Sequence, residues 1–129
     1  MTVLSFAHVN LRAPQPLLER LERFYVEVIG LQPGPRPPLR SRGYWLYAGG
    51  RDVLHLSEAA PGERRDGNGP GGFDHFALHC RDRAAVEERL RRHAVAFESV
   101  EVAQTGRLQL FLQDPAGNGV ELSFERSDT

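Results

Sequence analysis

Residues 6–12, FAHVNLR, return 67 positions later as residues 73–79, FDHFALH, with Phe, His and Leu in register. A second match links residues 54–57, LHLS, with residues 120–123, VELS, 66 positions further on. Because the two matches have nearly the same offset, the chain reads as two similar halves. This repeat decides the fold, since each half is expected to form the same structural unit.

We assign module one to residues 1–57, a linker to residues 58–71 and module two to residues 72–124, all within a single domain spanning residues 1–129. The linker is rich in Gly, Pro and charged residues, a composition typical of an exposed loop. A chain of 129 residues has the length of one compact domain with its own apolar core.

Each half shows the same order of elements: a strand, a helix and three strands. Gly30 ends the helix of module one, and Asp82 is the candidate N-cap of the helix in module two. The expected strands are residues 3–12, 44–47 and 53–57, with one poorly marked strand before residue 44, and then residues 73–80, 97–102, 108–112 and 119–124. The sequence therefore predicts two βαβββ modules of the α+β class.

The composition excludes several classes of partner. Sixteen basic residues against seventeen acidic ones give a net charge of -1, so no overall field attracts nucleic acid or an anionic membrane. The apolar stretches are too short to cross a bilayer, and the first residues lack the features of a secretory signal. The single Cys80 cannot form a disulfide within the chain. We therefore expect a cytoplasmic protein whose partner is a small molecule.

Four side chains of metal-ligand type occupy matched positions in the repeat. His8 and His75 lie in the first strand of each half, and His55 and Glu121 lie in the last. Strand alternation turns their apolar neighbours to the opposite face, so all four are expected on the face away from the helix. If the halves pair into one concave sheet, three imidazoles and one carboxylate converge on one point.

These donors suit a divalent transition metal, namely Zn²⁺, Ni²⁺, Fe²⁺, Mn²⁺ or Co²⁺, rather than Ca²⁺ or Mg²⁺. A single strand histidine is more often a half-buried residue with a hydrogen bond. Four donors at equivalent positions favour the metal, because an unpaired Glu121 on an apolar sheet would be costly to desolvate.

Two further motifs make a family resemblance definite. Residues 24–31, FYVEVIGL, are similar to the F-Y-x-x-V-L-G-L motif, and residues 114–122, DPAGNGVEL, precede and include the last donor. With the paired modules and the strand histidines, these motifs resemble those of the vicinal oxygen chelate superfamily. The resemblance covers residues 3–124. It implies a cupped eight-stranded mixed sheet, a divalent metal in the cup, substrates that chelate through neighbouring oxygens, and a homodimer with paired or exchanged modules.

Within the superfamily, the resemblance to glyoxalase I implies a metal-dependent lyase of the lactoylglutathione type. His8, His75 and Glu121 match three of its four ligand positions, and Arg12 matches an arginine that binds the carboxylate of glutathione, the co-substrate. His55 stands where that family usually has Glu, so Glu121 and His55 are the candidate catalytic acid/base residues. The asparagine that contacts glutathione in that family is absent here.

Two alternatives remain open. Extradiol dioxygenases and fosfomycin-modifying enzymes share a set of two histidines and one glutamate, which His8, His75 and Glu121 match, with His55 as a fourth ligand or an acid/base group. The common dioxygenases carry twice as many modules as this chain holds, and the chain has no lysine for a phosphonate. The third class is a metal-free drug-binding module of the bleomycin-resistance type, whose members generally lack the ligands.

Four residues are candidates for substrate binding: Asn10, Arg12, Tyr44 and His79. Asn10 stands beside the first histidine, where the fosfomycin enzymes commonly have Thr. Arg12 either clamps an anionic group or pairs with an acidic neighbour. His79 follows His75 by four residues and is either a proton relay or a hydrogen-bonded wall residue. Tyr44 either lines the substrate cup or packs with other aromatic residues.

Overall fold

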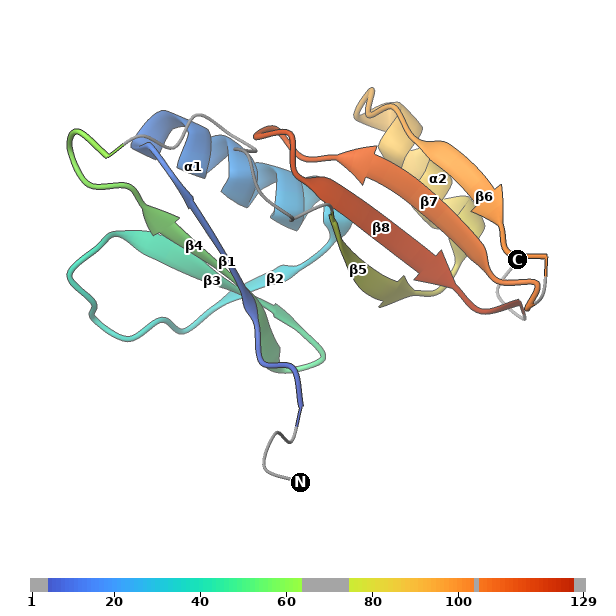
Figure 1. The fold of residues 1–129 in the computed structure, drawn as a ribbon, viewed down its shortest axis with the longest axis horizontal. Coiled ribbons are helices and arrows are strands. Elements are labelled where there is room, and N and C mark those ends of the chain that lie inside the picture. The colour runs from blue at the N-terminus through green and yellow to red at the C-terminus, as the bar shows by residue number, and fades with distance from the viewer. Residues whose placement is uncertain (1–4, 64–74, 104, 127–129) are drawn as a thin grey trace. The chain divides into compact units, whose positions relative to one another are not determined.

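The computed structural model describes residues 5–63, 75–103 and 105–126. The chain divides into two compact units, Met1–Gly67 and Asn68–Thr129. Each unit holds a four-stranded mixed sheet and one helix, drawn in Figure 1. Among the described residues, no helix is long and apolar enough to cross a membrane.

The first unit has the strand order β1-β4-β3-β2, with β1 parallel to β4 and the other neighbours antiparallel. Its elements are β1 (Val9–Ala13), α1 (Gln15–Arg23), η1 (Phe24–Ile29), β2 (Gln32–Gly34), β3 (Gly43–Ala48) and β4 (Arg51–Glu58).

The helix of the first unit changes its winding before it ends. Leu18 and Leu21 of α1 are buried, and η1, a π-helical continuation, buries Phe24, Tyr25 and Val28. The wider π turns keep these neighbouring apolar side chains directed at the core. Gly30 then adopts φ 97°, the left-handed conformation expected of a glycine at a helix end.

The second unit repeats this plan with the order β5-β8-β7-β6, in which β5 runs parallel to β8. Its elements are β5 (His75–Cys80), α2 (Arg83–Arg92), β6 (Glu98–Glu101), β7 (Leu108–Gln113) and β8 (Gly119–Phe124). The carboxylate of Asp82 accepts a hydrogen bond from the Ala85 backbone N–H at 3.3 Å, which confirms Asp82 as the N-cap.

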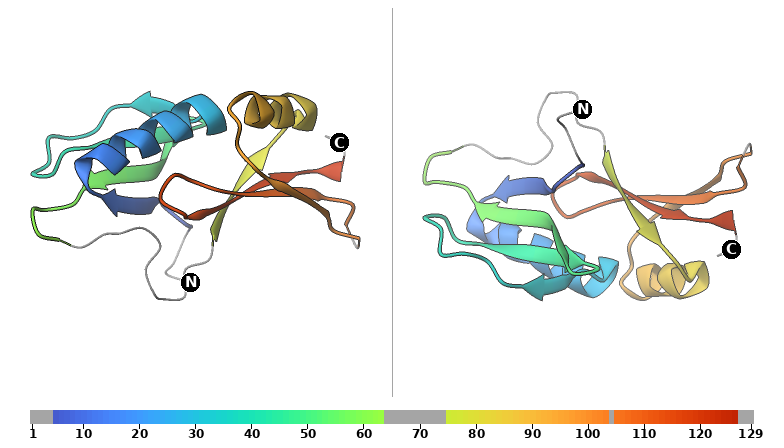
Figure 2. Two further views of the ribbon diagram at one scale, coloured as in Figure 1. Left: turned by 90° about the horizontal axis from the view of Figure 1, so that it is seen from above. Right: turned by 90° about the horizontal axis from the view of Figure 1, so that it is seen from below.

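The helices separate the two faces of each sheet. Figure 2 shows α1 and α2 each lying along one face of its own sheet. In the first unit the buried face carries Leu54 and Leu56 of β4, and in the second it carries Leu110 and Leu122. Alternation therefore directs the intervening residues, including His55 and Glu121, to the face away from the helix.

One irregularity interrupts this alternation. Leu46 pairs with Leu54 but the next residue of β3, Tyr47, pairs with Asp52, so Val53 is an extra residue in β4. The hairpin that follows β3 turns at Gly49 and Gly50, both with positive φ, as a tight two-residue turn requires. This bulge places Asp52 on the same face as His55.

The α+β class and the two βαβββ modules are confirmed. The poorly marked strand is β2, whose three residues are all exposed. His8 lies one residue before β1 rather than within it, and the first two residues of the expected 73–80 strand lie outside the described part of the chain, as does most of the linker. The joined eight-stranded sheet and the homodimer stay predictions.

Candidate metal centre

In the first unit, His55 is enclosed between two aromatic rings. The Trp45 ring stacks on one side with centroids 4.0 Å apart, and the His8 imidazole stacks on the other at 3.7 Å. The register explains the first contact, because Trp45 lies directly opposite His55 on the neighbouring strand. The His55 side chain is 12% exposed and is held between these two rings.

A hydrogen bond fixes the in-plane position of the same imidazole. His55 Nε2 lies 2.7 Å from Asp52 Oδ2, so the ring N–H donates to the carboxylate. This hydrogen bond is the main reason that the pKa of Asp52 lies below its ordinary value. Together, His8, Asp52 and His55 place three possible ligand atoms within 4.8 Å of one another.

Asp52 is a candidate ligand that sequence reasoning missed. It lies between the strands expected at residues 44–47 and 53–57, and regular alternation places a residue three positions before His55 on the opposite face. Only the extra residue Val53 reverses that placement. No signal in the sequence marks Val53 as a bulge, because the register of β4 on β3 determines it.

In the second unit, a matching pair of donors lies in contact. His75 Nε2 is 3.2 Å from Glu121 Oε1, and Gln109 Nε2 donates a hydrogen bond to Glu121 Oε2 at 3.2 Å. The Phe111 and His75 rings are perpendicular to each other, with centroids 5.8 Å apart. Parallel pairing of β5 with β8 brings the two donors to one face, and Glu121 is only 9% exposed there.

The spacing of this pair fits a shared cation. Two ligand atoms bound to one ion at about 2.0–2.2 Å, at octahedral or tetrahedral angles, lie about 2.8–3.6 Å apart, and the 3.2 Å between His75 and Glu121 falls in that range. Imidazole and carboxylate donors are also the types that divalent transition metals accept. The residues of the second unit therefore fit the metal that the family resemblance implies.

The donors of the first unit fit in type but are oriented differently. The His8 and His55 rings are tilted by only 17°, so their in-plane lone pairs run side by side instead of meeting at a point. For both to bind one cation, a ring must rotate out of the stack. The structure brings His8 together with His55 and His75 with Glu121, each pair within its own unit, and the joint set of four ligands stays a prediction.

Two candidate substrate residues of β1 are engaged by neighbours. Arg12 Nε donates to both carboxylate oxygens of Glu63, at 2.8 and 3.0 Å, and this interaction raises the Arg12 pKa. Asn10 Nδ2 donates to Ser57 Oγ at 3.2 Å, and Arg12 Nη1 lies 3.4 Å from the same hydroxyl. Both side chains face the same side of the sheet as His55, which their register fixes.

The other two candidates, His79 and Tyr44, differ in the face that they occupy: His79 lies on the side of its sheet away from the helix, and Tyr44 lies on the helix side. His79 belongs to the face of His75 and Glu121, where its Nδ1 is 3.5 Å from Arg107 Nη2. Tyr44 pairs with Leu56, so it lies on the helix side of its sheet, where it lines a cavity of about 460 Å³ with Gln15 and Leu18. The structure therefore places Trp45, not Tyr44, beside His55, because the strand register assigns odd-numbered residues of β3 to that face.

Comparison with known proteins relates this chain to a described family. A family model described as the Glyoxalase/Bleomycin resistance protein/Dioxygenase superfamily matches residues 5–122. A search of curated proteins finds no significant match.

Solved structures show the same fold at low sequence identity. A putative glyoxalase family protein from Bacillus anthracis superposes with a TM-score of 0.77 and 20% identity, covering 97% of this chain and 98% of that one. A glyoxylase/bleomycin resistance protein/dioxygenase domain from Frankia sp. EAN1pec gives 0.76 and 20%, with coverage of 97% and 100%. Lactoylglutathione lyase from Agrobacterium tumefaciens gives 0.69 and 22%, with 98% of both chains covered. By the family match over nearly its whole length, the chain belongs to the Glyoxalase/Bleomycin resistance protein/Dioxygenase superfamily.

Proposed function

We propose that the protein is a metal-dependent enzyme of the glyoxalase type, which acts as a lactoylglutathione lyase on a small substrate that chelates a divalent metal through neighbouring oxygens. The observation that carries this proposal is the 3.2 Å contact between His75 and Glu121 on the face of the second sheet away from α2. The ligand set is completed by His8 and His55, and glutathione is the co-substrate. We also propose that the protein acts as a homodimer.

The chemistry follows from the residues of each unit. A bound divalent metal supplies Lewis-acid polarisation of substrate oxygens. Glu121 is the carboxylate that accepts the substrate proton, and Gln109 holds its second oxygen in place. His55 has its Nε2–H directed at Asp52, which leaves Nδ1 as the ring nitrogen that binds the metal and that, when released from it, accepts a proton.

To be bound by Arg12, a carboxylate of glutathione must compete with the carboxylate of Glu63. The Arg12 guanidinium is bound by both oxygens of Glu63, so a glutathione carboxylate must displace a side chain that is already in place. An ion pair that is still partly open to solvent contributes little to stability, which makes such an exchange feasible.

One observation favours a second function. The His55 ring is stacked on both sides and its Nε2 is held by Asp52, so the other donors of the predicted set are His8, His75 and Glu121. Two histidines and one carboxylate form the ligand class that leaves open positions for oxygen and a chelating substrate on Fe²⁺. An extradiol-type dioxygenase is therefore the runner-up.

The test begins with the metal and then separates the two reactions. Protein reconstituted with Ni²⁺, Zn²⁺ or Co²⁺ should bind one ion per site, and Glu121→Gln should lose that ion while the exposed Glu101→Gln retains it. We expect the reconstituted protein to turn over the hemithioacetal of methylglyoxal and glutathione. Oxygen uptake with catechols after anaerobic Fe²⁺ loading, without hemithioacetal turnover, would instead establish the dioxygenase. Protein that binds none of these ions and turns over neither substrate overturns the enzymatic proposal.

A further inference from the structure

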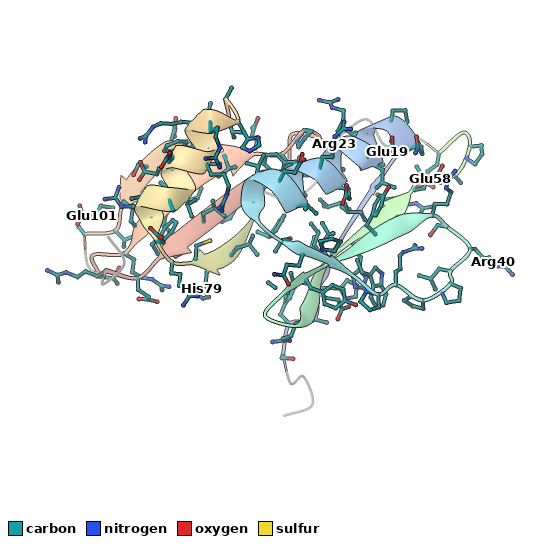
Figure 3. All side chains as sticks on the ribbon, turned by 180° about the vertical axis from the view of Figure 1, so that it is seen from behind. Glu19, Arg23, Arg40, Glu58, His79 and Glu101 are labelled. Atoms are coloured by element: carbon teal, nitrogen blue, oxygen red, sulfur yellow. The ribbon has the colours of Figure 1, made fainter. Side chains whose placement is uncertain are left out.

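A small cavity lies beside Glu121 on the face of the second sheet away from α2. It has a volume of about 150 Å³ and is lined chiefly by Ala77, His79, Arg107, Gln109, Glu121 and Ser123. The strand register accounts for this grouping, because Ser123 lies between His79 of β5 and Gln109 of β7. Figure 3 shows His79 projecting from the end of β5, away from α2. The cavity is therefore built from three adjacent strands of one unit.

Arg107 is the only arginine in the lining of this cavity, and not all of its N–H donors have an acceptor within the described residues. Its Nη2 contacts Glu125 Oε1 at 3.0 Å and His79 Nδ1 at 3.5 Å. Its Nε is buried and has no hydrogen-bond partner within the described residues. The Arg107 side chain as a whole is 35% exposed, so an incoming acceptor can reach its guanidinium, and a turn of the group that brings Nε onto that acceptor removes the cost of a buried donor without one.

The ion pair of Arg107 is a weak competitor for such an acceptor. The Glu125 side chain is 61% exposed and offers one oxygen, and pairs of this kind contribute little net free energy. Arg12 differs, since both oxygens of Glu63 already occupy its Nε. Of these two arginines, Arg107 is thus the better receptor for the planar, two-oxygen geometry of a carboxylate.

The position of the cavity sets the shape of the ligand. Ser123 lies two residues after Glu121 on the same face of β8. Two residues of a strand span about 6.7 Å. A substrate whose reacting oxygens lie at Glu121 would therefore place a second group, about 7 Å away, beside Ser123 and its neighbour His79, which Arg107 contacts. The small volume admits a compact group such as a carboxylate rather than a bulky one.

We propose that Arg107, with His79 and Ser123, forms a carboxylate-binding subsite, and that the substrate is an acid carrying its carboxylate on a short spacer from the neighbouring oxygens. This inference deepens the proposed function and rests on it for the identity of the substrate. The subsite itself rests only on residues of the second unit.

The first experiment compares two hydroxy acids on the metal-reconstituted protein. 2-Hydroxyglutarate carries a distal carboxylate, whereas 2-hydroxybutyrate presents the same hydroxy-acid end without it. We expect 2-hydroxyglutarate to bind about tenfold or more tightly, as a charge-assisted contact implies. Arg107→Gln should remove this preference, and Arg92→Gln, on the exposed side of α2, should retain it. Equal affinity of the wild-type protein for both acids overturns the proposal.

The second experiment uses metal-free protein, so its outcome is separate from that of the proposed metal chemistry. Propionate is titrated while the arginine Nε–H signals are followed by NMR, with propionamide as the neutral control. We expect a saturable shift of the Arg107 signal with propionate alone, and tighter binding in Glu125→Gln, where the competing carboxylate is gone. Loss of the shift in Glu125→Gln, or an equal response to propionamide, overturns the subsite even if the protein proves to be a metalloenzyme.

Discussion

The Asp52 carboxylate and the His55 imidazole, three positions apart in one strand, lie 2.7 Å from each other on the same face of the sheet. Residues at this separation in a regular strand point to opposite faces. The extra residue Val53 makes the contact possible, because it lets Asp52 rather than Val53 pair with Tyr47. The contact and the stack around His55 lead to the first two predictions.

Trp45 should report its stack on His55. It is the only tryptophan of the chain, and its ring lies 4.0 Å from the His55 ring in a parallel stack. The imidazole covers one face of the indole and so sets the surroundings of the fluorophore. We expect His55→Gln to change the Trp45 emission spectrum and His79→Gln to leave it as in the wild-type protein. A wild-type spectrum in His55→Gln would contradict the stack.

Asp52→Asn should alter the stability of the metal-free protein in a pH-dependent way. The His55 hydrogen bond lowers the pKa of Asp52 in the folded state. The resulting stability is therefore present above the ordinary carboxylate pKa and is lost as the pH falls through the lowered value. We expect wild-type protein to have the higher Tm near neutral pH, with the difference shrinking in acid.

The control for Asp52→Asn is the same substitution made in the His55→Gln background. Because His55 is the main cause of the lowered pKa, the pH-dependent difference should largely disappear there. A difference of the same size in both backgrounds would trace the effect to another partner of Asp52. Calorimetry across pH 3 to pH 7 measures all four proteins.

Gln109→Leu should weaken metal binding without removing a ligand. Gln109 orients the second oxygen of Glu121, and loss of such an outer partner typically lowers affinity about 10- to 100-fold. Competition with a chromophoric chelator for Zn²⁺ measures the change. Gln113→Leu, at the exposed end of the same strand, is the matched control, and an equal loss in both variants would contradict this role.

Gly43→Ala should destabilise the first unit. A Cβ at this position would lie 2.0 Å from the Leu56 carbonyl oxygen, and the backbone cannot yield without breaking the pairing of β3 with β4. We expect a loss of about 2–3 kcal/mol in the free energy of unfolding, measured with urea. Gly50→Asn, in open space at a φ that Asn tolerates, should cost less than about 1 kcal/mol. A similar loss in both would show that the close approach at Gly43 is not the cause.

Local patterns in the sequence were enough to predict the elements of both units. The strand expected at 119–124 has those bounds in the structure, and Gly30 ends its helix as expected, because turn chemistry and apolar spacing act over a few residues. The three-residue β2 was poorly marked since all its residues are exposed and carry no apolar pattern.

The candidate site was only partly predictable. The repeat placed His75 and Glu121 on one face, and their contact follows from the parallel pairing of β5 with β8. The positions of Tyr44 and Asp52 depend on which residues lie opposite them in neighbouring strands, and a single sequence does not encode that register locally. Residue type was therefore easier to predict than the direction of a side chain.

The extra residue in β4 also has a consequence for how relatives of this chain are compared. Because Val53 is an extra residue, the Asp52 carboxylate lies on the same face of the sheet as His55, while Leu54 and Leu56 remain buried on the other face. A position-by-position alignment that ignores the insertion would match Asp52 to a residue turned the other way. One inserted amino acid thus brings a carboxylate to the face of His55 while the hydrophobic layer beneath it stays in place.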